Sequence, residues 1–121
     1  MTGTGTCLVI LFEFTDHPAD QEAHPASAYH DLIFSEGEFP SGSMNDYYQE
    51  VSYGAFQIGG TNTDWILAEN SYASYANPDG TQDAGTARVM IEDAVAQIDP
   101  FIDFSQYDSD GPDGIPNSGD D

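Results

Sequence analysis

The sequence predicts a fold of the α/β (α+β) class, in which helices cover a mixed sheet. The first observation is a continuous apolar run rich in branched side chains at residues 8–12, LVILF, which is typical of a strand buried on both faces. The second is a helical pattern that changes to strand alternation at Gly54. The third is a longer amphipathic helix that ends near Gln97. With 121 residues, the chain is long enough for one domain with a modest core and too short for two.

The first strand is expected to end at the polar turn Asp16-His17-Pro18. A polar, acidic surface loop should follow over residues 19–27. Residues Ala28–Phe34 then predict a short helix, with Tyr29, Leu32 and Ile33 on one side.

The stretch from Ser43 to Gly60 carries the clearest local signals. Ser43 can cap a helix, and Asp46 stands three residues later, close to a capping box. Gly54 is expected to end this helix. Residues 55–58 then alternate between small or polar and large apolar side chains, which indicates a strand.

Beyond that corner, residues 62–67 are expected to continue the strand, and Ser71–Tyr75 to form one helical turn. Pro78-Asp79-Gly80 predicts a turn. Thr81 or Asp83 should then cap the long helix, which Pro100 stops. Its predicted sheet-facing residues are Ala84, Ala87, Ile91, Ala94, Val95 and Ile98.

Two smaller expectations concern the same region of the chain. We expect Phe101, Ile102 and Phe104 to pack back onto the domain. Arg88 should form a solvated pair with Glu92, one helical turn away.

The charge balance is extreme, with 22 acidic residues against one cation and a net charge of −21. The electric field of this negative charge repels nucleic acid and anionic membranes, so neither is an expected partner. A salt-adapted surface and an extracellular, cation-loaded surface explain this composition about equally well, and both do so better than disorder.

The single cysteine, Cys7, opens the apolar run and is predicted to be a buried, inert thiol. No apolar run approaches the ~20 residues of a membrane span. The run at residues 7–12 also lacks the flanks of a signal peptide. If the protein is exported, its targeting segment is expected to lie outside this chain.

Motifs for catalysis are absent from the sequence. His17, His24 and His30 are spaced unlike metal ligands and are predicted to lie on the surface. The zinc-helix pattern HExxH, the GxSxG elbow, the phosphate loop and the dinucleotide fingerprint do not occur. With so many acids, some pair of carboxylates is inevitable and carries no signal.

The segment at residues 108–121, DSDGPDGIPNSGDD, carries the strongest chemical signal. Closely spaced carboxylates between glycines and prolines can bring several hard oxygens to one calcium ion. The spacing is not that of an EF-hand, and the competing interpretation is an acidic tail with no specific ion. The candidate calcium ligands are Asp108, Asp110, Asp113, Asn117 and Asp120.

Taken in order, three stretches resemble the M6 family of metalloproteases, the immune inhibitor A group. They are LVILFEFTDHP, then SMNDYYQEVSYGAFQIGG with Trp65 close behind, and FIDFSQYDSDGPDGIPNSGDD after the long helix. The resemblance covers roughly residues 7–121, and DYYQEVSYG is its most specific part. It implies a zincin-like α/β catalytic domain, zinc-dependent hydrolysis of protein or peptide substrates, bound calcium and secretion.

In that family, HExxH follows the Asp-rich segment, so we expect residues 1–121 to be a single partial domain, the N-terminal part of the peptidase domain. No zinc ligand or catalytic residue is assigned, and the chain alone is expected to be inactive. Two alternatives remain. One is a non-catalytic, calcium-stabilised extracellular binding module, and the other is an acidic structural domain adapted to high salt.

Overall fold

A computed structural model describes residues 2–77, 79, 84–108 and 114–115 of the chain. The predicted α/β class is confirmed, because strands and helices alternate along the chain. The elements are β1 (Gly3–Glu13), α1 (Ala26–Phe34), α2 (Met44–Val51), β2 (Phe56–Leu67), the 3-10 turn η1 (Tyr72–Ser74), α3 (Ala84–Ile98) and the 3-10 turn η2 (Phe104–Gln106).

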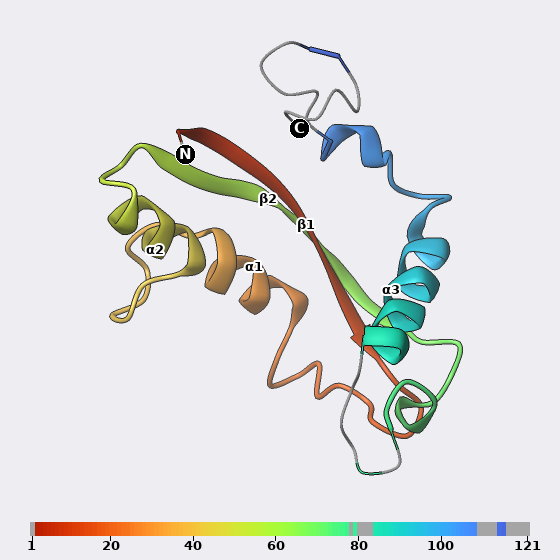
Figure 1. Cartoon of the computed structure of the whole chain (residues 1–121). Helices are drawn as coiled ribbons and strands as arrows, with labels where there is room; N and C mark the ends of the chain where they lie inside the picture. Colours follow the sequence, from red (N-terminus) through yellow and green to blue (C-terminus); the bar gives the residue numbers. More distant parts are fainter. Residues whose placement is uncertain (1, 78, 80–83, 109–113, 116–121) are drawn as a thin grey trace.

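Within the described residues, the sheet consists of β1 and β2, which run parallel. The register joins Gly3 to Phe56 at one end and Glu13 to Leu67 at the other, with a shift between Val9 and Leu11. Parallel neighbours need a crossover connection. Here α1 and α2 form that crossover, and they lie along one side of the strand pair (Figure 1).

The α2–β2 corner confirms the predicted cap. The Ser43 side chain accepts a hydrogen bond from the Asp46 amide (3.0 Å), and the Asp46 carboxylate accepts one from the Ser43 amide (2.9 Å), which completes a capping box. Asp46 also accepts from the Gly37 amide. These donors, Ser43 first, lower the pKa of the Asp46 carboxyl. One side chain therefore fixes both the start of α2 and the loop before it.

The same helix closes the outer edge of β2. The Ser52 hydroxyl accepts from the Phe56 amide (2.9 Å), and the Asn45 side-chain carbonyl accepts from the buried Ile58 amide (2.9 Å). Asn45 itself is only 3% exposed. Asn45 lies in α2 and Ser52 is its C-cap residue, so the side of the helix toward β2 carries two polar side chains beside Tyr48, whose ring packs on Phe56.

The chain leaves α2 through two left-handed residues. Tyr53 has φ 57° and Gly54 has φ 77°. The predicted stop at Gly54 is thus shared with a tyrosine, for which this conformation is uncommon. The Tyr53 side chain is 99% exposed.

The core is small and lies in two places, with Ile58 beside α2 and the other buried apolar residues around the far ends of β1 and β2 and in α3. The buried apolar residues are Leu11, Ile58, Ala68, Tyr75, Ala94 and Ile98. The prediction that residues 8–12 are buried on both faces is therefore wrong except at Leu11, and Cys7 is only half-buried. The reason is that α1 and α2 pack against β2, so neither helix covers β1.

The long helix is confirmed over Ala84–Ile98, but its burial differs from prediction. Ala94 and Ile98 are buried, whereas Ile91 is 58% exposed. Phe101 is 86% exposed, so it does not pack back onto the domain. The predicted cap residues, Thr81 and Asp83, lie outside the described residues, as do Pro78 and Gly80 of the predicted turn. The Arg88–Glu92 pair is confirmed, with 2.8 Å between Nε and Oε1 at the surface.

Candidate functional site

The predicted calcium ligands are described at one position only. Asp108 is exposed and, together with Phe104, Ser105 and Tyr107, lines an open hollow of about 550 Å³. The four remaining candidates, Asp110, Asp113, Asn117 and Asp120, lie outside the described residues. The calcium site therefore stays a prediction.

Asp103 caps the 3-10 turn η2, which comes just before the segment at residues 108–121. Its carboxylate accepts hydrogen bonds from the Ser105 hydroxyl (2.7 Å) and the Ser105 amide (3.1 Å), which caps η2. The Ser105 donors lower the pKa of the Asp103 carboxyl. The Asp103 carboxylate therefore accepts hydrogen bonds from a residue two positions away in the sequence.

The three histidines are exposed, as predicted. The His17 ring lies on Tyr72, with the ring centroids 4.8 Å apart, and His30 lies 3.7 Å from an oxygen of Asp31. Within residues 2–77, 79, 84–108 and 114–115, no three His, Cys, Asp or Glu side chains gather as a metal site would need. The described residues therefore do not fit the zinc ion that the family implies, and we derive no zinc-dependent step from them.

Carboxylates at the end of β1 hold loops in place. Glu13 accepts from the Ala19 amide (2.9 Å) and from the Gln21 side chain (3.0 Å). Asp16 accepts from the Tyr72 amide (2.7 Å), and this donor lowers the pKa of the Asp16 carboxyl against the opposing effect of desolvation. The carboxylates at the polar end of this strand therefore anchor the loop after β1 and the start of η1.

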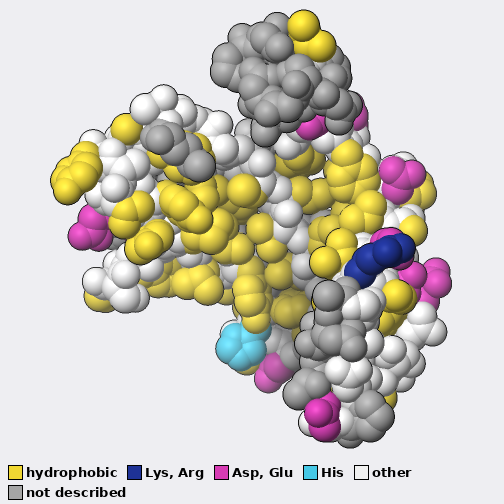
Figure 2. All heavy atoms as spheres, viewed as in Figure 1, with side chains coloured by type: hydrophobic (Ala, Val, Ile, Leu, Met, Phe, Trp, Pro, Cys, Tyr) yellow, Lys and Arg dark blue, Asp and Glu magenta, His cyan; other side chains and the backbone are white. Residues whose placement is uncertain are grey.

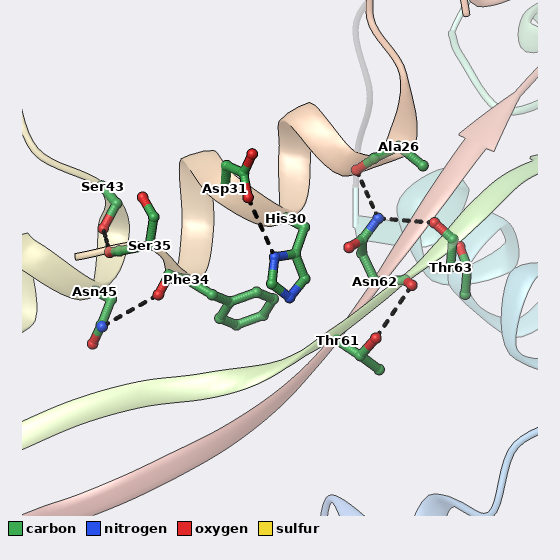
Figure 3. A network of polar contacts seen from close by, with 10 residues as sticks. All are labelled: Ala26, His30, Asp31, Phe34, Ser35, Ser43, Asn45, Thr61, Asn62 and Thr63. Carbon is green, nitrogen blue, oxygen red and sulfur yellow. Dashed lines mark hydrogen bonds and ion pairs between the residues drawn. The ribbon is translucent and has the colours of Figure 1, made fainter. Parts of the chain in front are cut away.

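A polar network joins the crossover helices to β2 (Figure 3). The Asn62 side-chain amide donates to the carbonyl oxygens of Ala26 (2.9 Å) and Thr63 (3.0 Å), which ties the start of α1 to the middle of β2. At the other end of α1, the Ser43 hydroxyl donates to the Ser35 carbonyl. Sequence reasoning did not find Asn62, because its partner lies 36 residues away and no local pattern marks it.

A second set of hydrogen bonds, which the sequence did not predict, joins α3 to the segment that follows β2. The hydroxyl of Tyr75, which is 1% exposed, donates to Asp93 of α3 (2.7 Å), and the Asn70 side chain donates to the same hydroxyl (3.2 Å). Burial, and then Asp93, raise the pKa of the Tyr75 hydroxyl. The Tyr75 ring packs on Phe14 just beyond β1, with the centroids 5.8 Å apart.

One face of the molecule is rich in apolar side chains (Figure 2). Hydrophobic side chains gather over α1, α2 and the strands in Figure 2, while acidic side chains are scattered at the margins and over α3. Exposed apolar residues in this structure include Tyr47, Val51 and Leu32. No helix in the described part of the chain combines the length and the apolar character that crossing a bilayer requires.

Comparison with protein-family models identifies the chain as a peptidase domain. The model described as immune inhibitor A peptidase M6, catalytic domain, matches residues 2–120. Because the match covers nearly the whole chain, this chain belongs to the M6 peptidase family, which confirms the resemblance seen in the sequence. No curated protein sequence matches the chain.

Membership of this family makes the chain a metallopeptidase-like domain, and protein or peptide substrates are what the peptidase family implies. The described part of this domain consists of the parallel strand pair, its crossover helices and α3. It contains no cluster of side chains that could form a metal centre.

Proposed function

We propose that this chain is the N-terminal part of a secreted, zinc-dependent metalloendopeptidase domain, whose zinc ligands and catalytic glutamate lie in sequence beyond Asp121. One observation carries the proposal: the M6 catalytic-domain model matches residues 2–120, while HExxH is missing from the 121 residues. The fold supports it, since β1, α1, α2 and β2 form a framework without a metal-binding cluster among the described residues.

The first prediction is that the purified 121-residue chain does not hydrolyse an unfolded protein such as casein, with or without added zinc. A longer product of the same reading frame that includes HExxH should hydrolyse it, and the Glu→Gln change within that motif should abolish the activity, because the general base is lost. Zinc-dependent hydrolysis by the short chain that is lost when His17, His24 and His30 are replaced would contradict the proposal, because the chain would then hold zinc ligands of its own.

The second prediction concerns the segment at residues 108–121. Millimolar calcium should raise the melting temperature of the chain more than magnesium or sodium chloride of matched ionic strength. A ligand that binds the folded state alone stabilises it by RT ln(1 + [L]/Kd), about 2.7 kcal/mol at a hundredfold excess over Kd. Asp110→Ala should remove most of the calcium-specific shift, whereas the control Asp64→Ala, an exposed aspartate on β2, should retain it.

The same titration separates the alternatives. A calcium-specific shift in a protein whose reading frame continues without HExxH would favour a non-catalytic, calcium-stabilised binding module. Equal stabilisation by all three salts would favour an acidic domain adapted to high salt, since screening of 22 carboxylates then explains the whole effect.

A further inference from the structure

The peptide bond between Asp99 and Pro100 lies at the point where α3 ends. It is the one aspartyl-prolyl bond in the 121 residues. Ile98 is the last residue of α3, and the Asp99 amide still donates to the Val95 carbonyl (2.9 Å). Proline has no amide hydrogen and cannot continue the helix. The bond therefore joins α3 to η2 and to the acidic segment at residues 108–121.

A hydrogen-bonded turn presents this bond to solvent. The Ile98 carbonyl accepts from the amides of Phe101 (2.9 Å) and Ile102 (3.1 Å), so the backbone turns sharply around the bond. Asp99 and Pro100 are both exposed, and the Phe101 side chain beside them is 86% exposed. Water and dissolved acid therefore reach the bond in the folded chain.

The Asp99 carboxylate has no partner in the described part of the chain, where it forms neither a hydrogen bond nor an ion pair. Its acidic neighbours in sequence, Asp93 and Asp103, each accept a hydrogen bond from another side chain. The one Lys or Arg of the chain, Arg88, pairs with Glu92. Among the described residues, no donor therefore holds the Asp99 carboxylate away from its own backbone carbonyl.

We propose that the Asp99–Pro100 bond is a self-cleavage site that acid activates. The carboxylate and the carbonyl that it attacks belong to one residue, so the reaction gains from proximity that a carboxylate in solution lacks. The Pro100 nitrogen belongs to a tertiary amide. It leaves as an amine once it takes up a proton. The cut separates residues 1–99 from residues 100–121, which contain all the predicted calcium ligands.

The cleavage has two steps. In the first, an oxygen of the Asp99 carboxylate bonds to the Asp99 backbone carbonyl carbon, and the bond from that carbon to the Pro100 nitrogen breaks. The nitrogen keeps the electron pair and takes a proton from the acidic solution, which leaves a cyclic anhydride at Asp99. In the second step, one water adds to the anhydride and opens it to two carboxyl groups. No metal, oxidant or peptidase site takes part, so the proposal is independent of the proposed function.

The test follows the 121-residue chain by mass spectrometry during incubation for several weeks, in buffers from about pH 7 down to about pH 4, close to the ordinary pKa of an aspartyl carboxyl. EDTA and protease inhibitors exclude contaminating proteases, and circular dichroism identifies the buffers in which the chain is folded. We expect fragments 1–99 and 100–121 to form at a rate that is independent of protein concentration. The rate should be at least about tenfold higher at the acidic end, because proton transfer to the leaving nitrogen needs acid.

Two variants test the chemistry. Asp99→Glu keeps the charge but must close a larger ring, and Pro100→Ala replaces the tertiary amide by a secondary one. Each should slow the cut at least about tenfold. The Asp103–Phe104 bond is the internal control and should stay intact, because the Ser105 donors hold the Asp103 carboxylate and no proline follows it.

A parallel incubation in urea tests the contribution of the fold. The folded chain should be cut at a rate within about tenfold of the unfolded chain at the same pH, since the turn leaves both reacting groups exposed. A folded chain that stays intact while the unfolded chain is cut would overturn the proposal, because the fold would then protect the bond. Equal rates for Asp99→Glu and the original chain would also overturn it.

Discussion

Gly60→Ala is expected to break the pairing of β1 with β2. Gly60 has φ 149°, and a Cβ built on it would overlap the backbone carbonyl of Cys7 on the facing strand. Because the obstacle is backbone, relief requires the strands to separate, and we expect the free energy of unfolding to fall by about 3 kcal/mol or more. Denaturant unfolding followed by circular dichroism measures this loss.

Gly59→Ala is the matched control for that variant. An added Cβ at Gly59 would meet only the Thr4 methyl group, at 3.9 Å, which is ordinary contact. Alanine also loses less backbone entropy than glycine on folding, so the control should be neutral or stabilising by about 0.5 kcal/mol. Similar losses in both variants would show that the close approach of the strands at Gly60 is not what limits the substitution.

Tyr75→Ala is expected to have the other large effect on stability. Tyr75 is the largest side chain that is fully buried among the described residues, and it joins Phe14, Asn70 and Asp93. Removing a buried aromatic ring costs about 3–5 kcal/mol. Thermal or denaturant unfolding should therefore show α3 detached from the strand ends or the whole chain unfolded.

Two further variants divide this effect into its parts. Tyr75→Phe keeps the ring but leaves the Asp93 carboxylate without its hydroxyl donor, and should cost about 1 kcal/mol. Tyr53→Ala changes a tyrosine that is 99% exposed and should cost little. A Tyr75→Ala variant as stable as Tyr53→Ala would contradict the view that Tyr75 fastens α3 to the sheet.

Features that depend on neighbouring residues along the chain could be predicted well. The capping box of Ser43 and Asp46, the helix-to-strand corner and the Arg88–Glu92 pair all join residues within four positions. Their geometry follows from helix periodicity and local hydrogen bonding, so the sequence contains all the information they need.

Features that depend on distant segments could not be predicted from the sequence. Asp16 accepts from the amide of Tyr72, 56 residues away, and Asn62 reaches back 36 residues to Ala26. The predicted burial of some apolar residues was wrong for the same reason. Ile91 and Phe101 have apolar side chains in a suitable pattern, yet they are exposed, because no described element packs over them.

For the candidate site, the sequence determined the M6 resemblance, the missing HExxH and the acidic segment, since these depend only on residue identity and spacing. The tertiary structure decided that Glu13, at the end of β1, and Asp16, just after it, anchor loops through backbone amides. It also decided that α2 turns the polar Asn45 and Ser52 toward β2, closing one edge of the sheet. These outcomes required the tertiary structure because they depend on contacts between segments that are far apart in the sequence. Local periodicity predicts helices and strands, but it does not predict which of them come into contact.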